Sequence, residues 1–311
     1  MANANVSRAA GEYNANYTRN IKIKSGILMA ICILISIVCL LPIWLLLVNA
    51  TKSTAEITGS ASNALSRFIP GTNIITNIKS LVASTENGGN PEFTRAFNVF
   101  YGFRNSLVIA VCSAGLSVFF SGLTAYGLTV YDFRLKKGAT TFILMVMMIP
   151  TQVISTGFLQ FMVSIKLYDN YLPIILPAIA APQVVFFMLQ YMKSVFPLDI
   201  VEAARIDGCG EFRTFLQIGL PILKPAFAVQ AIFAFVTNWN NYYTPSMLLL
   251  SNKIEQRTMP MMVASVLGND KIADFGAKYM AVAISILPVV VVYLILSKYI
   301  IGGVTLGSVK G

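Results

Sequence analysis

Histidine is absent from this chain of 311 residues. Imidazole is the commonest metal-ligating side chain and a frequent general base near neutral pH, so histidine-based catalysis and histidine-ligated metals are excluded. The four cysteines form no CxxC pair, which argues against a zinc site or a framework of disulfides. We therefore expect no metal site in this chain.

Charge is also scarce, because only 12% of the residues are Asp, Glu, Lys or Arg, against about 25% in ordinary soluble domains. Hydrophobic residues make up 56% of the chain, and the charges fall in clusters separated by long apolar stretches. A helix needs about 20 apolar residues to cross a bilayer core of about 30 Å. The composition predicts an all-α membrane protein.

Hydropathy predicts six transmembrane helices, at residues 26–48, 105–130, 141–161, 172–192, 226–250 and 279–297. The first follows a basic segment and so imitates a secretory signal. Its apolar run of about 23 residues exceeds the roughly 7–15 of a signal core, which favours an uncleaved anchor. Residues 1–25 are then an N-terminal tail, and residues 26–311 form one membrane domain that ends in a tail at about 298–311.

The net charge of +10 comes from Lys and Arg in short segments beside the apolar helices. No basic stripe is interleaved with aromatic residues, so nucleic-acid binding is disfavoured. The densest clusters precede the first span and follow the second and fourth, at Arg8, Arg19, Lys22, Lys24, Arg134, Lys136, Lys137, Lys193, Arg205, Arg213 and Lys224. Basic loops stay on the cytoplasmic side of a membrane, so both termini are expected to be cytoplasmic.

None of the 13 acidic residues, and no Lys or Arg, lies inside a predicted span. A carrier driven by protons or sodium usually needs an ionisable or ion-coordinating group near mid-membrane. This absence disfavours an ion-coupled carrier and predicts that the energy for any transport comes from a partner protein.

Uncharged polar groups do interrupt the predicted spans, at Thr151, Gln152, Gln183, Asn238, Trp239, Asn240 and Asn241. An amide in hydrocarbon is costly unless it is hydrogen-bonded, so these groups either bond neighbouring helices or line a wet path. Amides with an aromatic face suit a neutral, hydroxyl-rich solute. Small residues at Ser113, Ser117, Ser121 and Ala125 share one face of the second span, which favours close helix packing over a solute contact.

The segment at residues 193–225, between the fourth and fifth spans, reads KSVFPLDIVEAARIDGCGEFRTFLQIGLPILKP. Pro197 suits a first helical turn, Gly208 suits a helix end, and Glu211 opens a second short helix. That helix is expected to carry Phe212, Phe215 and Leu216 on one face. Such a pair could lie on the membrane surface, or dock into another protein with Glu202, Arg205 and Asp207 at its face.

Within this segment Glu202-Ala203-Ala204, Gly208 and Ile218-Gly219-Leu220-Pro221 match the EAA signature of the permease subunits of type I ATP-binding-cassette importers. The chain resembles that family over about residues 20–311. Further motifs resemble the smaller subunit of its maltose and oligosaccharide branch: Arg104-Asn105-Ser106, Ile149-Pro150-Thr151-Gln152, Asn238-Trp239-Asn240-Asn241 and the last ten residues. Asn241 departs from many relatives, which carry another residue after Trp-Asn.

The resemblance implies a type I importer permease fold, in which six helices pair with a second, related permease. Two ATPase subunits would dock below and an extracytoplasmic solute-binding protein above, in a bacterial plasma membrane. This chain would bind no cofactor, because ATP and Mg belong to the partner ATPase. It would be no enzyme itself.

The resemblance also assigns roles to residues. The EAA loop, at about residues 193–224, would be the coupling helix seated in an ATPase cleft, with Glu202 against a basic group there. The coupling residues would be Glu202, Ala203, Ala204, Arg205, Asp207, Gly208, Phe212, Leu220 and Pro221. Lys310 and Gly311 would reach between the ATPase subunits, and residues 251–278 would extend toward the binding protein.

The expected function is half of the translocation pathway of an ATP-driven sugar or oligosaccharide importer. The closest alternative is an importer permease for a polyol or a peptide-like solute. An ion-coupled carrier and a non-transporting membrane scaffold or receptor remain as rival classes.

Overall fold

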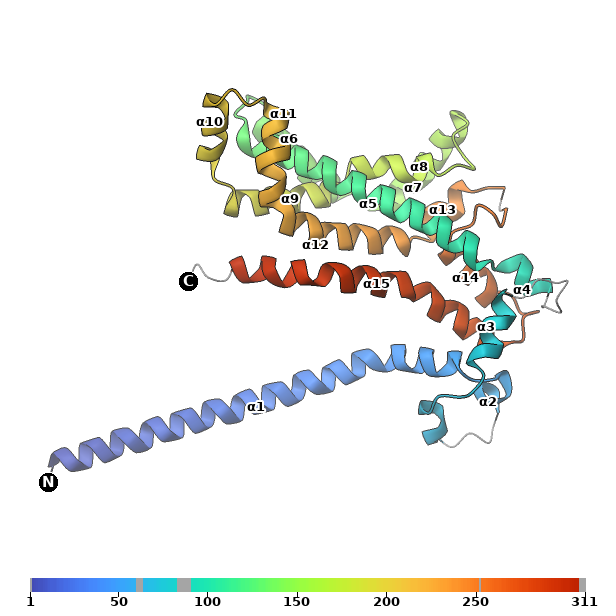
Figure 1. Ribbon diagram of the computed structural model, residues 1–311, viewed down its shortest axis with the longest axis horizontal. Coiled ribbons are helices and arrows are strands. Elements are labelled where there is room, and N and C mark those ends of the chain that lie inside the picture. The colour runs from blue at the N-terminus through green and yellow to red at the C-terminus, as the bar shows by residue number, and fades with distance from the viewer. Residues whose placement is uncertain (1, 60–63, 83–90, 252, 308–311) are drawn as a thin grey trace. The chain divides into compact units, whose positions relative to one another are not determined.

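The computed structural model describes residues 2–59, 64–82, 91–251 and 253–307, and all regular structure within these ranges is helical (Figure 1). The chain forms two compact units. The first holds the residues up to Asn77 together with Asp274–Met280, and the second holds Ile78–Ala273 together with the residues from Ala281 onward.

The first unit is built on one long helix. Its elements are α1 (Ala2–Ala50), α2 (Thr54–Thr58), the 3-10 helix η1 (Ala64–Phe68), the first turn of α3 (Ile74–Val82) and the start of α15 (Phe275–Gly307). The buried Asn77 amide donates to the carbonyls of Ala50 (2.8 Å) and Lys52 (2.9 Å). The ammonium of the buried Lys52 donates to the Ser66 carbonyl at 2.7 Å. The two bonds of Asn77 satisfy backbone oxygens at and just after the end of α1.

The second unit holds the remaining helices. They are α4 (Pro91–Ala96), α5 (Val99–Val130), α6 (Lys136–Met147), α7 (Thr151–Ser164), α8 (Leu172–Ile175), the 3-10 helix η3 (Leu176–Ile179), α9 (Pro182–Val195), α10 (Leu198–Ile206), α11 (Glu211–Thr214), the π-helical turn η4 (Phe215–Gly219), α12 (Leu220–Trp239), α13 (Tyr243–Leu248), α14 (Met259–Leu267) and the rest of α15. The main core lies where α5, α9 and α12 meet, around Tyr126, Met188 and Phe215.

The ridge of small residues on α5 lets α12 approach closely. Ser113, Ser117, Ser121 and Ala125 are all buried, which confirms their predicted role in packing. Gly122 lies on the same side and is in direct contact with the Phe227 ring of α12, where an added Cβ would collide. The absence of side-chain bulk therefore sets the distance between the two helices.

Five of the six predicted spans correspond to helices long and apolar enough to cross a membrane. Within the described residues these are Lys22–Ala50, Pro91–Val130, Leu172–Val195, Glu211–Trp239 and Phe275–Ser297. The third predicted span is instead divided into α6 and α7 by a break at residues 148–150. Pro150 lacks an amide hydrogen, and a proline also disfavours helical geometry in the residue before it.

The remaining spans and the tails compare with the sequence prediction as follows. The fourth span is kinked as expected, because prolines divide it into α8, η3 and α9. The fifth span was placed too late in the chain, since its helix ends at Trp239 and residues 243–248 form the separate α13. The segments predicted as tails continue α1 back to Ala2 and α15 on to Gly307.

Candidate functional site

The elbow, defined here as residues 196–219, turns the chain from α9 into α12 (Figure 1). Pro197 precedes the first turn of α10, and the helix ends at Gly208, whose φ is +75°. The Cys209 amide donates to the Ala204 carbonyl (2.9 Å) and the Gly208 amide to the Arg205 carbonyl (3.0 Å). This pair of bonds is the Schellman motif, which favours glycine at the left-handed position. The predicted helix, glycine turn and second helix beginning at Glu211 are therefore present.

Helix α10 buries one face and exposes the other. Val201 and Ala204 pack into the core, whereas Glu202, Ala203 and Asp207 face outward. Among the described residues Glu202 and Asp207 make no side-chain hydrogen bond or ion pair. Large apolar side chains stand beside them, because Ile206 is 87% exposed and Phe212 is 57% exposed. A surface with apolar anchors and unpaired acids is able to bind a partner that carries basic groups.

The second helix of the elbow differs from its prediction in two ways. It does not stop before Pro221, because α11 continues through the π-helical turn η4 directly into α12. Its three apolar residues also differ in burial: Phe215 is buried against Phe119 and Tyr126, whereas Phe212 and Leu216 are exposed. Neighbouring residues on a helix point about 100° apart, so the core takes Phe215 without taking Leu216. Leu220 is half-buried, and Pro221 is exposed.

A triangle of side chains, Tyr131, Arg205 and Glu211, fixes the elbow to the end of α5. Arg205 Nε donates to Glu211 Oε1 at 2.7 Å, and the Tyr131 hydroxyl donates to Glu211 Oε2 at 2.8 Å. The Arg205 guanidinium also lies 5.7 Å from the Tyr131 ring centroid. Burial, followed by the bond to Glu211, raises the pKa of Tyr131, and the same carboxylate raises the pKa of Arg205. Sequence reasoning found Arg205 but missed Tyr131 and the pairing role of Glu211, since nothing in the spacing joins residues 131 and 211.

The polar groups predicted for a pathway lie at helix ends and breaks rather than in mid-helix. Gln183 is exposed in the first turn of α9, after the break at residues 180–181. Thr151 and Gln152 open α7, and the structure does not describe their side chains. These positions are helix ends because prolines, which hydropathy ignores, divide the helices at these points. Their depth in a membrane stays a prediction.

Residues 238–241 lie where α12 ends, and three of their side chains form hydrogen bonds with the backbone. Asn238 donates to the Ala234 carbonyl (2.8 Å), and the buried Trp239 indole donates to the Ser285 carbonyl of α15 (3.0 Å). The remaining two are Asn240, which is exposed, and Asn241, whose side chain accepts from the Thr244 amide at 3.1 Å. Among the described residues no hydrogen bond joins Gln183 to this group.

A clamp that sequence reasoning did not recognise, Arg104, Asn105 and Ser106, lies at the Val99 end of α5. The Asn105 side chain is fully buried, and its amide donates to the carbonyls of Glu255 (2.8 Å) and Arg257 (2.9 Å). The buried Ser106 hydroxyl accepts from the amide of Met259, the first residue of α14, at 2.7 Å. Arg104 donates to the Glu255 carbonyl as well, at 3.1 Å. The motif had drawn attention by resemblance alone, because its acceptors are backbone oxygens that no sequence pattern reveals.

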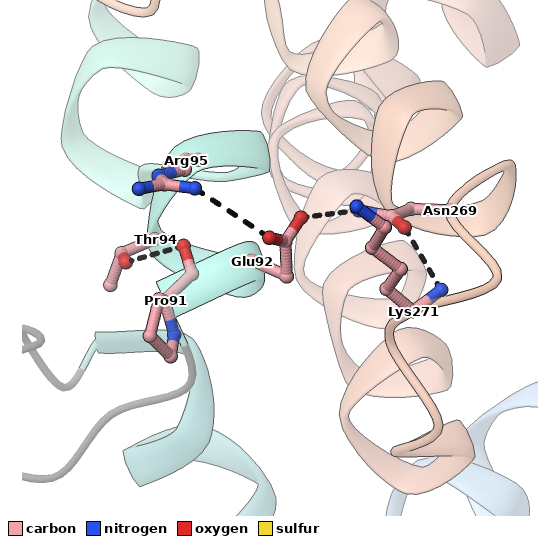
Figure 2. A network of polar contacts seen from close by, with 6 residues as sticks. All are labelled: Pro91, Glu92, Thr94, Arg95, Asn269 and Lys271. Carbon is pink, nitrogen blue, oxygen red and sulfur yellow. Dashed lines mark hydrogen bonds and ion pairs between the residues drawn. The ribbon is translucent and has the colours of Figure 1, made fainter.

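Other polar contacts order the region around the clamp. Tyr171 donates to the Gln256 carbonyl (3.2 Å), and Asp169 accepts from the Ser251 amide (2.7 Å). Figure 2 shows Glu92 of α4 between Arg95 and Asn269; its carboxylate oxygens lie 3.6 Å from the Arg95 guanidinium and 3.4 Å from the Asn269 amide nitrogen.

The segment 251–278, expected to be the loop between the fifth and sixth spans, contains the partly buried helix α14.

The predicted contact of the C-terminal tail and the expectation of no metal site both stay predictions. Lys310 and Gly311 lie outside the described residues. Within the residues that the structure does describe, no group of three or more Cys, Asp or Glu side chains is placed to hold a metal ion.

Residues 117–305, which include the elbow, match the family model described as "Binding-protein-dependent transport system inner membrane component". The chain belongs to this family. With several apolar helices, this binding-protein-dependent permease is a multi-pass membrane protein, and its family is a transporter component rather than a catalytic one.

Relatives of the permease are similar over most of their length. It is 34% identical to the arabinooligosaccharides transport system permease protein AraQ of Bacillus subtilis, over 89% of this chain and 93% of AraQ. It is 28% identical to the probable starch degradation products transport system permease protein AmyC of Thermoanaerobacterium thermosulfurigenes, over 94% of this chain and 99% of AmyC. It is 35% identical to the maltodextrin permease MdxG of B. subtilis, over 67% and 75%.

The fold of the permease also has a counterpart among solved structures. A chain in the crystal structure of a bacterial ABC transporter involved in the import of the acidic polysaccharide alginate matches with a TM-score of 0.72. The match covers 88% of this chain and 95% of that one, at 21% identity. The similarity at this level of identity establishes a common fold.

Proposed function

We propose that this permease forms half of the translocation pathway of an ATP-driven importer for a sugar or oligosaccharide. The observation that carries the proposal is the match to relatives named for arabinooligosaccharides, starch products and maltodextrin over most of the chain. The absence of Asp, Glu, Lys and Arg from the predicted spans supports an external source of energy.

The chain would act with four kinds of partner: the lipid bilayer, a second permease, two ATPase subunits that bind ATP and Mg, and an extracytoplasmic solute-binding protein. Both termini would be cytoplasmic. The chain would cross the membrane six times, with α6 and α7 together making the interrupted third crossing, since irregular backbone is tolerated at depth where protein or a wet cavity surrounds it.

The elbow would be the surface that receives the ATPase. Its exposed Glu202 and Asp207, flanked by Ile206 and Phe212, suit a socket that offers basic groups and an apolar floor. Closure of the ATPase pair on ATP would move the elbow and turn the bundle outward, and hydrolysis would reset it. Nucleotide shifts such an equilibrium only through differential affinity for the two states. Lys310 and Gly311 would add a second contact with the ATPase.

The pathway itself would use the polar helix ends, at Thr151, Gln152, Gln183, Asn238, Trp239, Asn240 and Asn241. Of these, Gln183 and Asn240 support the idea best, because both side chains are exposed in the isolated chain. Amide side chains can donate to and accept from sugar hydroxyls.

The proposal is tested by ATP hydrolysis in liposomes that hold the permease with its second permease, ATPase and solute-binding protein. We expect hydrolysis to rise several-fold when the binding protein carries a gluco- or arabino-oligosaccharide. No stimulation by any glycan, with clear stimulation by a peptide or a polyol, would overturn the assignment to sugars.

A further inference from the structure

Helix α5 is tied by hydrogen bonds near both of its ends to a segment of proposed function. It runs for 32 residues, which corresponds to about 48 Å at 1.5 Å per residue, enough to cross the bilayer. In Figure 1 it extends from the neighbourhood of α10 and α11 to that of α14.

At its Val99 end the clamp holds the chain that leads into α14. The clamp residue Asn105 is wholly buried and makes two bonds to backbone carbonyls, and Ser106 adds a third bond at Met259. Buried polar groups are costly to leave unpaired, so this segment and α5 separate only by losing several hydrogen bonds at once.

At its Val130 end the triangle holds the elbow. The ion pair of Arg205 with Glu211 is a short charge-assisted bond, and Tyr131, the residue after α5, bonds the other oxygen of the same carboxylate. Tyr126 of α5 adds a buried edge-to-face contact with Phe215, at 5.3 Å between ring centroids. The elbow is therefore held to the Val130 end of α5 by polar and apolar contacts together.

Between the two ends α5 is closely packed. Its small-residue ridge is buried, and Gly122 touches Phe227. Densely packed interiors shift between discrete arrangements rather than deforming continuously. Displacement of one end of α5 should therefore displace the other end as well.

We propose that Asn105 and Glu211 are positioning residues that tie the segment before α14 and the elbow to opposite ends of α5, so that α5 carries movement between them. The inference rests on the proposed function, because it names the route by which the ATPase side and the binding-protein side of that transporter sense each other. Neither residue needs to touch solute or nucleotide.

The experiment compares basal and solute-stimulated ATP hydrolysis of the full complex in liposomes. Asn105→Asp keeps the side-chain volume but removes both amide donors, and Glu211→Gln keeps the shape but removes the charge. The double variant combines them. Asp132→Asn is the matched control, since this exposed acid lies outside the elbow and makes no side-chain hydrogen bond or ion pair among the described residues.

We expect each single variant to assemble and to lose about tenfold of the stimulation by solute, measured as the ratio of stimulated to basal hydrolysis of the same variant. The double variant should lose about tenfold as well, because breaking either end already disconnects the route, whereas unrelated distant sites would multiply to about a hundredfold. Exchange of the charges, Arg205→Glu with Glu211→Arg, should restore part of the stimulation.

Multiplied losses, or full stimulation in either single variant, would overturn the role of α5 and leave the proposed function standing. A wild-type complex that no glycan stimulates would overturn the proposed function, and the inference with it. Co-purification of the subunits is measured for every variant. If Glu211→Gln fails to assemble, Tyr131→Phe, which removes only one hydroxyl from the triangle, tests the same end.

Discussion

Individual residues of α10 determine which side chains the elbow buries and which it exposes. The EAA signature divides between two faces of α10, because Ala204 packs into the core while Glu202 and Ala203 point outward. An alanine at position 204 fits that core contact, and an acid at position 202 remains available for a basic partner. The two halves of the motif thus follow from opposite physical requirements.

Reversing the charge at Glu202 tests this division. Glu202→Lys should leave insertion and folding unchanged, since the side chain is exposed and unpaired among the described residues, but should abolish ATP-driven uptake. Uptake of labelled oligosaccharide by cells carrying the variant is the measurement. Asp132→Lys reverses an exposed acid just beyond α5 and serves as the control, with uptake expected within about twofold of the wild type. Normal uptake in Glu202→Lys would remove the coupling role from this residue.

Gly208 is tested by its backbone geometry. Gly208→Ala forces a side chain into the left-handed region at φ +75° and should cost about 1–2 kcal/mol locally, which would displace the end of α10 and lower stimulated ATP hydrolysis. Gly210→Ala should have little effect, because an added Cβ there meets nothing within 4 Å and φ is −69°. Equal hydrolysis in both variants would mean that the turn geometry does not matter for coupling.

At the scale of helices, packing on α5 depends on the absence of a Cβ at one position. Gly122→Ala drives a methyl group into the Phe227 ring and should destabilise the protein by about 1–3 kcal/mol. Gly115→Ala on the same helix is the control, because its added Cβ meets nothing within 4 Å. Thermal unfolding in detergent should show a lower midpoint for Gly122→Ala alone. A lower midpoint for both variants would point to helix propensity or lipid contacts instead.

Hydropathy located the apolar helices well but not their interruptions. A window average detects that residues 141–161 are apolar, yet the direction of the chain at Pro150 depends on one missing amide hydrogen. The amides of Gln183 and Asn240 also lie at helix ends, since Gln183 follows Pro182 at the start of α9 and Asn240 follows Trp239, the last residue of α12. The turn at Gly208 was predictable, because glycine after a helix has a local cause.

At the scale of the whole molecule, the fold could be anticipated from composition and one motif, whereas its long-range ties could not. Asn105 bonds to carbonyls about 150 residues later in the chain, and Glu211 pairs with Tyr131 from 80 residues earlier. Such pairs carry no periodicity, and backbone acceptors carry no residue identity. The match of residues 117–305 to a permease family confirmed the family that the motif at residues 202–221 had indicated.

This helical bundle, which has no Asp, Glu, Lys or Arg inside its predicted spans, is proposed to take its energy from ATP hydrolysed by a partner. The most direct test is uptake of labelled oligosaccharide by proteoliposomes that hold the complete complex, with and without ATP and with or without a proton or sodium gradient. The account predicts uptake only with ATP and a hydrolysis-competent ATPase, and independent of either gradient. Uptake driven by a gradient in the absence of the ATPase would contradict it.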